Sequence, residues 1–361
     1  MRYARQTVLD AVGAQGQETI GAAKVLIVGL GGLGSPLALY LAAAGVGHLG
    51  LVDADTVSLS NLQRQILYQT NDCGQPKVAL ASARLEALNP DVRCAAYPVF
   101  LDSANAESIA ADYDIIVDAT DNFETKYLLN DLAVKLGKPL VFGSILRFSG
   151  QASIFWAEHG PCYRCLFPTI PEHYIPNCAE AGVLGAVAGF IGSLQALEVI
   201  KLILLLNNAL PNGYSTLVGR IFTFDGQTMV SHTHRLAKDP DCPVCSINRA
   251  DVVLPQLDLK CAVAEESAHK LKEHWEDYRW IDVREEAEWE KGHIPNALLW
   301  PLSRMKSGEW PVAAQRPTVV YCQSGVRSRQ ALALLKDQNW TMIQHLPEGF
   351  GAWAGPVEQG M

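Results

Sequence analysis

The chain has 361 residues, which is more than one hydrophobic core usually organises, so its length predicts two domains. Hydrophobic residues make up 49% of it and charged residues 19%, a composition typical of globular proteins. The formal net charge of -9 argues against binding to nucleic acid or to an acidic membrane surface, because both attract basic proteins. We therefore expect a globular protein without either partner.

Two further features indicate the cytoplasm. The N-terminal residues 1–6 lack the apolar run that leads to a signal-peptide cleavage site. The most apolar segment, residues 183–206, is interrupted by Gln195, Glu198 and Lys201, whereas a membrane span needs about 20 nearly uninterrupted apolar residues. We interpret it as a buried helix and expect a cytoplasmic protein.

The first part of the chain alternates short apolar runs with helical ones. Strands are expected at 24–28 and 48–52, with a helix of small residues at about 35–44 between them. Further strands are expected at 113–118 and 138–142. Strands separated by helices predict an α/β fold with a doubly wound, mostly parallel sheet.

The pattern changes after Cys245. Residues 246–260 contain no periodic element, and a second α/β pattern follows, with strands at 280–283 and 318–321 and a helix at 328–338. The expected organisation is therefore a larger α/β domain at 1–245, a linker at 246–259 and a smaller α/β domain at 260–361.

A glycine cluster follows the first expected strand and opens the first expected helix. Small residues there let the backbone approach phosphates, and the helix N-terminus offers free N–H groups and a favourable dipole. Asp53 ends the next strand, at the spacing of an acid that meets ribose hydroxyls. The pattern predicts a nucleotide site. Its glycines are Gly29, Gly31, Gly32 and Gly34.

The glycine pattern alone does not distinguish ATP from NAD, because NAD-dependent oxidoreductases share it. Several polar residues nearby in sequence favour ATP. Activation of a carboxylate expels pyrophosphate, which requires cations for the phosphate charge and a carboxylate for Mg²⁺. Each of these residues alone would be interpreted as a solvated surface group. They are Asp55, Asn61, Gln63, Arg64, Lys77 and Asp121.

Nine cysteines in a chain with no expected export signal argue against a disulfide scaffold. Four of them form two C-x-x-C pairs, Cys162 with Cys165 and Cys242 with Cys245. Two such turns can supply the four thiolates of a tetrahedral Zn²⁺ site. The alternatives are a redox dithiol or unrelated thiols.

Cys322 begins a short loop between an expected strand and an expected helix. A thiolate there faces loop N–H groups and a helix N-terminus, both of which lower its pKa and stabilise a persulfide anion. Arg327, five residues later, can add positive charge. The loop predicts thiol chemistry.

An ordered set of motifs makes the first part of the chain resemble a known family. The motifs lie at 2–6, 29–34, 53–65, 74–77 and 118–122. Over residues 1–245 they resemble the molybdopterin-synthase and thiazole-biosynthesis adenylyltransferases (the MoeB/ThiF type), which are bacterial relatives of ubiquitin-activating enzymes. The resemblance implies a Rossmann-like fold, ATP and Mg²⁺ as ligands, and a structural zinc at the two C-x-x-C pairs.

The resemblance also implies roles for individual residues. Gly32 and Asp53 would contact the nucleotide, and Arg64 and Lys77 would hold phosphates. Asp121 would bind the magnesium. Arg5 would reach into the neighbouring subunit's site, which implies a homodimer. The other residues expected at the nucleotide, from the same motifs, are Gly29, Gly31, Gly34, Asp55, Asn61 and Asn122.

Over residues 260–355 the chain resembles single-domain rhodaneses, on the Cys322 loop and on segments 280–284, 292–297 and 348–353. The retained Cys322 implies sulfur transfer. His293 belongs to a structural segment of that pattern and is not expected to act as an acid or base.

The remaining cysteines receive separate interpretations. Alone, Cys178 would be a small buried residue. The resemblance places it where relatives carry a thiol that either bonds covalently to the sulfur-carrier protein, their substrate, or resolves a disulfide. Cys73, Cys94 and Cys261 have no motif around them and are expected to be packing residues.

Together these features predict adenylation of the C-terminal carboxylate of a ubiquitin-like sulfur-carrier protein ending in Gly-Gly. A Cys322 persulfide, loaded by a donor such as a cysteine desulfurase or thiosulfate, would then form a thiocarboxylate, with Cys178 as the second thiol. Related enzymes serve molybdenum-cofactor, thiamine or thiolated-tRNA pathways. The alternatives are an NAD-dependent oxidoreductase with a fused rhodanese-like module and a non-catalytic carrier-binding scaffold.

Overall fold

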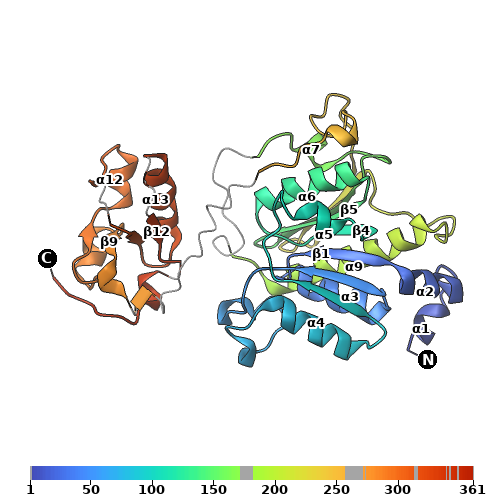
Figure 1. The fold of residues 1–361 in the computed structure, drawn as a ribbon, viewed down its shortest axis with the longest axis horizontal. Helices are drawn as coiled ribbons and strands as arrows, with labels where there is room; N and C mark the ends of the chain where they lie inside the picture. The colour runs from blue at the N-terminus through green and yellow to red at the C-terminus, as the bar shows by residue number, and fades with distance from the viewer. Residues whose placement is uncertain are drawn as a thin grey trace. The chain divides into compact units, whose positions relative to one another are not determined.

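Two separate β-sheets organise the chain, one in each of two units, Met1–Leu257 and Asp258–Met361 (Figure 1). The structure is a computed structural model. It describes residues 2–170, 182–256, 271–272, 274–312, 316–338, 340, 343–347 and 349–360.

The sheet of the first unit has the strand order β3-β2-β1-β4-β5-β6-β7-β8. Neighbouring strands are parallel from β3 to β5, and the pairs from β5 to β8 are antiparallel. The expected doubly wound, mostly parallel sheet is confirmed. The strands are β1 (Lys24–Val28), β2 (His48–Val52), β3 (Arg93–Tyr97), β4 (Ile115–Asp118), β5 (Leu140–Leu146), β6 (Ser149–Phe155), β7 (Arg220–Asp225) and β8 (Val230–Arg235).

Helices cover both faces of this sheet, with α3 and α4 on one side of the strands and α6 on the other in Figure 1. Apolar side chains of α3, α4 and α9 join one core cluster, and those of α5 and α6 join another. The helices are α1 (Ala4–Thr7), α2 (Gly13–Ala22), α3 (Gly34–Ala44), α4 (Lys77–Leu88), α5 (Ala106–Ala110), α6 (Phe123–Leu136), α7 (Tyr163–Leu166) and α9 (Gly185–Leu206).

Helix α9 is long and apolar enough to cross a membrane, with a mean hydropathy of 1.8. It nevertheless packs against α3, β5 and β6. Its polar Gln195 and Glu198 are buried, and Glu198 accepts a hydrogen bond from the Leu217 N–H at 2.7 Å. A Cβ on Gly192 would lie 2.4 Å from the Leu33 carbonyl oxygen, so the helix backbones approach closely. We therefore interpret α9 as a core helix.

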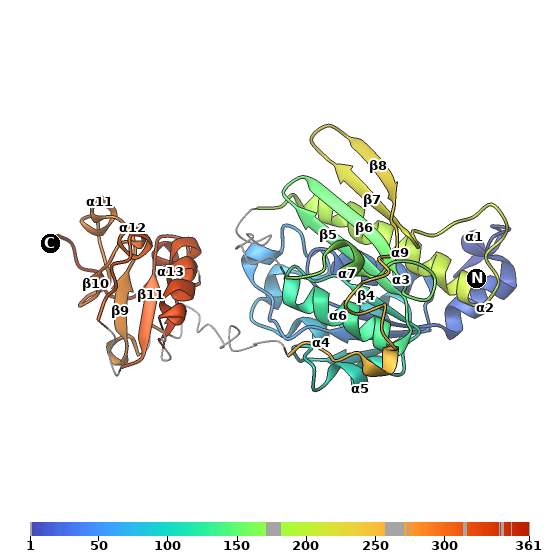
Figure 2. The ribbon, with the colours of Figure 1, turned by 90° about the horizontal axis from the view of Figure 1, so that it is seen from above.

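The sheet of the second unit is parallel, in the order β10-β9-β11-β12. Figure 2 shows α13 packed beside β11. Two apolar clusters make its core, around Val320 and around Trp280. Its elements are β9 (Arg279–Asp282), β10 (Leu298–Leu299), β11 (Thr318–Tyr321), β12 (Ile343–His345), α11 (Glu286–Trp289), α12 (Leu302–Lys306) and α13 (Val326–Asp337).

The described part of the expected linker packs against the first unit. A short 3₁₀ helix, η3 (Arg249–Asp251), precedes Val252 and Leu254, whose side chains are buried against the first unit. Lys135 also donates to the Val252 carbonyl oxygen at 2.8 Å. Two isolated apolar anchors give no sequence periodicity, which explains why this packing was not predicted.

Candidate functional site

The glycine loop between β1 and α3 is held against the end of β4. Gly29 has φ +91°, a left-handed conformation that favours glycine. A Cβ there would lie 2.7 Å from the Ala119 carbonyl oxygen, and one on Gly34 would lie 2.0 Å from the Gly29 carbonyl oxygen. The tight turn leaves no room for side chains at either position.

The strand order reverses beside this loop. β1 lies between β2 and β4, the Gly29 N–H donates to Val52 at 2.9 Å, and the Ala119 N–H donates to Val28 at 2.9 Å. The carboxyl ends of the three strands therefore meet at a topological switch point, where open α/β sheets bind their ligands.

Asp53 closes the glycine loop. Its Oδ2 accepts the Leu30 N–H at 2.8 Å, and its Oδ1 accepts the Asp55 N–H at 2.9 Å. Lys77, which is 4% exposed, donates to Asp55 Oδ2 at 2.9 Å and lies 4.0 Å from Asp53 Oδ1. Burial raises the pKa of Asp53, and the Lys77 ammonium partly opposes this rise. The structure brings these expected residues together.

The segment after β2 lines the other side of the loop. A Cβ on Gly32 would lie 3.3 Å from Arg64 Cγ, so the arginine stem adjoins the loop. Asn61 Oδ1 accepts the Ser58 N–H at 3.3 Å and closes the turn that carries Arg64.

Gln65, which the sequence analysis did not single out, adds an unsatisfied acceptor. Its buried Oε1 has no hydrogen-bond partner among the residues that the structure describes, and its Nε2 would lie 3.5 Å from a Cβ on Gly31. A buried acceptor beside the glycine loop fits a site completed by a polar ligand.

The loop after β4 contributes the expected metal carboxylate. The side chain of Asp121 is exposed. Asn122 Oδ1 accepts the Thr125 N–H at 2.8 Å and so caps α6. Asp121 thus lies in the loop that follows the carboxyl end of β4, directly after Ala119 and Thr120, whose backbone adjoins Gly29.

Arg5 lies elsewhere. It belongs to α1 and is exposed. The neighbouring Tyr3 packs on Gly45 and accepts a hydrogen bond from Asn89 at 2.8 Å, which places this segment at the C-terminal end of α3. Because α3 has 11 residues, it separates the segment from the glycine loop by about 16 Å.

The two C-x-x-C pairs come together although 80 residues separate them. All four sulfur atoms lie within 4.8 Å of one another, with Cys162 and Cys242 at 3.5 Å and Cys165 and Cys245 at 3.5 Å. A tetrahedral shell with Zn–S bonds of about 2.3 Å has its sulfurs about 3.8 Å apart, so the cluster has the right size.

The protonation of these thiols depends on what they hold. Burial raises the pKa of the Cys165 thiol to about 11. Several thiolates this close together repel one another unless a cation offsets their charge. The cluster is therefore better suited to a metal than to four free thiolates.

In the second unit, Cys322 lies at the end of β11 and is 1% exposed. Its carbonyl oxygen accepts the Phe350 N–H at 2.7 Å. Gly325 has φ +84°, and a Cβ there would lie 1.9 Å from the Pro347 carbonyl oxygen, so the loop turns tightly into α13. The predicted strand, cysteine loop and helix are all present.

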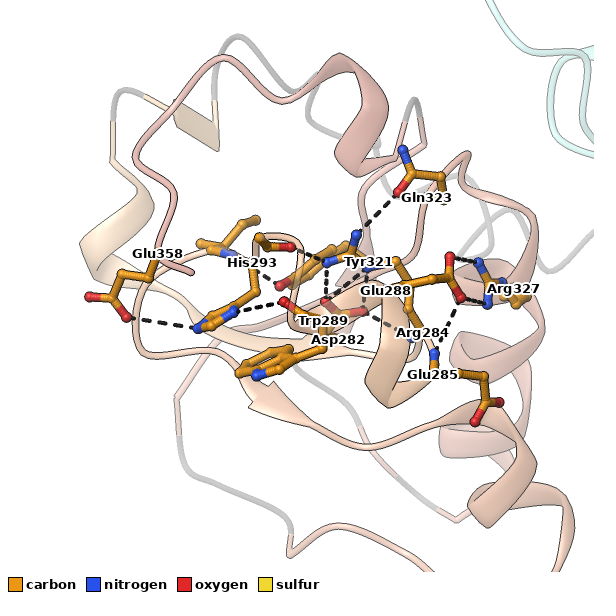
Figure 3. A network of polar contacts seen from close by, with 12 residues as sticks. Asp282, Arg284, Glu285, Glu288, Trp289, His293, Tyr321, Gln323, Arg327 and Glu358 are labelled. Carbon is orange, nitrogen blue, oxygen red and sulfur yellow. Dashed lines mark hydrogen bonds and ion pairs between the residues drawn. The ribbon is translucent and has the colours of Figure 1, made fainter. Parts of the chain in front are cut away.

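Two ion pairs hold the elements around this loop (Figure 3). The buried Arg284 binds Asp282 at 2.7 Å and donates to Gln323 Oε1 at 3.1 Å. Arg327 makes two hydrogen bonds of 2.6 Å with Glu288, which lower the pKa of Glu288. The charge of Arg327 is thus largely offset by Glu288.

His293 has structural contacts. Its ring stacks on Trp289 with centroids 3.6 Å apart and lies 3.9 Å from the Glu358 carboxylate (Figure 3). The backbones of His293 and Glu358 also pair. These contacts are consistent with the structural role expected for this histidine.

One cysteine interpretation was wrong. Cys73, expected as a packing residue, is exposed. It lies in the turn between the 3₁₀ helix η2 (Thr70–Asp72) and Gly74, whose φ is +86°. Cys94 is half-buried. Cys178 and Cys261 lie outside the described residues.

The first unit has a glycine loop at a sheet switch point, closed by the half-buried Asp53 and faced by a lysine, and this defines a nucleotide-binding α/β enzyme domain. The second has a buried cysteine at the start of a loop between a parallel strand and a helix. Residues 3–244 match the ThiF family model and residues 267–356 match the rhodanese-like domain model. The chain belongs to the ThiF family and carries a rhodanese-like domain.

Relatives named as adenylyltransferase and sulfurtransferase match nearly the whole chain. The chain is 39% identical over 381 residues to the probable adenylyltransferase/sulfurtransferase MoeZ of Mycobacterium tuberculosis, covering 100% of this chain and 94% of that protein. It is 38% identical to adenylyltransferase and sulfurtransferase MOCS3 of Anopheles gambiae, covering 99% and 87%. The sulfur carrier protein adenylyltransferase of Thermus thermophilus is 49% identical, covering 68% and 90%. The chain is an adenylyltransferase and sulfurtransferase.

Solved structures support the fold of the first unit. The crystal structure of E. coli MccB with MccA-N7isoASN has a TM-score of 0.60 and 22% identity, covering 68% of this chain and 74% of that one. E. coli MccB with ATP has a TM-score of 0.59 and 21% identity, covering 68% and 75%. At this identity the likeness concerns the fold.

Proposed function

We propose that this enzyme uses ATP to adenylate the C-terminal carboxylate of a ubiquitin-like sulfur-carrier protein ending in Gly-Gly, and then exchanges the adenylate for sulfur. The observation that carries the proposal is the presence, in one chain, of a glycine loop closed by Asp53 and a Cys322 loop at a helix N-terminus. The name of the Thermus relative supports a sulfur carrier as the substrate.

The chemistry proceeds in three balanced steps. A carrier carboxylate oxygen attacks the α-phosphorus of ATP and pyrophosphate leaves. The outer sulfur of a Cys322 persulfide attacks the acyl carbon and AMP leaves, giving an acyl disulfide. Cys178 attacks the Cys322 sulfur of that bond, which releases the thiocarboxylate and leaves a disulfide for an external thiol to reduce.

The nucleotide would lie across the glycine loop. The backbone at Gly32 approaches the phosphates, Asp53 fixes the loop and meets the ribose, and Lys77 with Arg64 offsets phosphate charge. Asp121 would hold Mg²⁺, which when bound neutralises charge on the leaving pyrophosphate. Other residues proposed to line this site are Gly29, Gly31, Gly34, Asp55, Asn61 and Asn122.

The four-cysteine cluster would hold a structural Zn²⁺. Its size fits four thiolates around one ion, and Val134 and Val252 surround it with apolar side chains. The ion would join the α7 segment to residues 242–245. It would stabilise the fold without taking part in the reaction.

A homodimer would complete the adenylation site. Arg5 lies at the far end of α3 from its own glycine loop, so it would serve a neighbouring subunit. The adjacent Val8 and Leu9 are 71% and 55% exposed, as expected for side chains that an interface covers.

Three further assignments belong to the proposal: the domain limits 1–245 and 260–361, a cytoplasmic location, and a cysteine desulfurase or thiosulfate as sulfur donor. The Cys322 loop accepts the donor's sulfur in either case.

Carrier-dependent exchange of labelled pyrophosphate into ATP tests the function. Candidate ubiquitin-like proteins ending in Gly-Gly should support the exchange, and the same proteins lacking the final glycine should not. Binding of NAD without any exchange would instead identify an oxidoreductase. Carrier binding without turnover would identify a scaffold. Either result would overturn the proposal.

A further inference from the structure

A buried lysine fixes the end of strand β4. Lys126 on α6 is 5% exposed. Its Nζ donates to Asp118 Oδ2 at 2.9 Å, to the Thr120 carbonyl oxygen at 2.9 Å and to the Gly143 carbonyl oxygen at 3.0 Å. An ammonium group has three donors, so all of them are used inside the protein. The Lys126 ammonium therefore stabilises the fold and does not serve as a phosphate ligand.

Other hydrogen bonds also fix Asp118 at the end of β4. Asp118 Oδ1 accepts the Thr120 N–H at 3.0 Å and the Thr120 hydroxyl at 2.7 Å. Gln195 on α9 donates to the Asp118 carbonyl oxygen at 2.8 Å. Because the Ala119 carbonyl oxygen adjoins Gly29, the fixed segment is in direct contact with the glycine loop.

Asp121 lies between two residues whose positions are fixed by hydrogen bonds, Thr120 and Asn122. The Thr120 carbonyl held by Lys126 belongs to the peptide group that leads into Asp121, and a peptide group is rigid and planar. On the other side, Asn122 is tied to the first turn of α6 through the Thr125 N–H. The exposed Asp121 side chain therefore starts from a backbone whose direction Lys126 helps to set.

We propose that Lys126 is a positioning residue for the metal carboxylate: through Asp118 and Thr120 it sets the direction in which Asp121 meets the Mg²⁺ of bound ATP. The inference rests on the proposed function, in which Asp121 holds that ion. Removing a group that orients a metal ligand typically lowers metal affinity by about 10- to 100-fold.

The test is calorimetric binding of a non-hydrolysable ATP analogue to the full chain, in Mg²⁺ and in EDTA. Lys126→Met should lower the Mg²⁺-dependent gain in affinity by about tenfold or more and leave the affinity in EDTA unchanged. Lys126→Arg restores a cation with several donors and should recover most of the gain. Lys135→Met is the matched control on the same helix, because Lys135 contacts Val252 and Glu107 instead, and it should behave as the native chain.

Lys126→Met leaves the buried Asp118 carboxylate without its cation, which can prevent folding. The double variant Asp118→Asn, Lys126→Met removes both charges and should show the same loss of gain. A native gain in the folded double variant, or an equal loss in EDTA, would overturn the proposal.

Asp121→Ala separates this inference from the proposed function. If it loses the gain while the Lys126 variants keep it, only the positioning role is wrong. If Asp121→Ala keeps the gain, the metal role proposed for Asp121 is wrong, and the inference fails with it.

Discussion

Lys77 donates a 2.9 Å hydrogen bond to Asp55, and the same ammonium lies 4.0 Å from Asp53. One largely buried cation therefore faces two carboxylates beside the glycine loop. A triphosphate bound there would add negative charge to a site that already carries two acids. Removal of Lys77 should therefore weaken ATP binding and adenylation at this loop more than the removal of any other single group there.

We expect Lys77→Ala to abolish carrier-dependent pyrophosphate exchange, because it removes the phosphate cation and leaves two carboxylates uncompensated. Losing one transition-state contact of this type costs about 3 kcal/mol, or more than a hundredfold in rate. Asp121→Ala should have a similar effect. The measurement is labelled exchange, with circular dichroism to verify folding and Lys135→Ala as the control. Near-native exchange in both folded site variants would contradict the assignment.

The glycine loop gives a second prediction. A Cβ on Gly34 would lie 2.0 Å from a backbone oxygen, so Gly34→Ala should displace the loop and abolish ATP binding. Gly189→Ala is the matched control, because a Cβ on this α9 residue would meet no atom of the described residues within 4 Å beyond its own helix backbone. That variant should bind ATP normally and gain up to about 1 kcal/mol of stability from helix propensity. Calorimetric titration with ATP distinguishes the two outcomes.

Local patterns in the sequence predicted the parts of the site that depend on contiguous residues. The glycine cluster, Asp53 and the Cys322 loop each follow a strand and precede a helix or turn, so local spacing indicated a nucleotide loop and a reactive thiol at these places. The residues that fix this geometry were not predicted. Lys126, Gln65 and Gln195 are polar side chains inside helices or turns, and only the packing of distant elements reveals their burial and partners.

The strands β6, β7 and β8 were also missed. β7 and β8 carry few buried side chains, and the strand β8 is exposed throughout. An alternating apolar pattern requires a face packed on the core, which β8 lacks. The C-x-x-C pairs show the opposite case, because their chemistry predicted an association across 80 residues that no periodicity would indicate.

Zinc gives a third prediction. We expect about one Zn²⁺ per chain, as one four-thiolate shell requires. The double variant Cys242→Ser, Cys245→Ser should lose the metal and unfold at a lower temperature, because the ion joins two distant segments. The double variant Cys73→Ser, Cys94→Ser is the control and should keep its zinc. Metal analysis that finds none in the native protein, together with a fully stable Cys242 and Cys245 variant, would refute the site.

The last prediction separates the two chemistries of the chain. Adenylation uses the glycine loop of the first unit, whereas sulfur donation needs the nucleophile at the Cys322 loop of the second. Cys322→Ala should therefore keep pyrophosphate exchange and lose both thiosulfate:cyanide sulfurtransferase activity and thiocarboxylate formation. Cys178→Ala should keep exchange and the isolated sulfurtransferase activity but release less thiocarboxylated carrier.

Mass spectrometry of the carrier decides between these outcomes, because sulfur replacing oxygen at the acyl carbon adds about 16 Da. Cys73→Ala controls for the loss of an exposed thiol and should leave every activity intact. The Cys322 side chain is buried but small, so its replacement by alanine removes a single sulfur atom and should leave the domain folded. If the Cys322→Ala enzyme still forms thiocarboxylate at the native rate from a protein persulfide donor, Cys322 is not the sulfur source, and the second half of the mechanism is wrong.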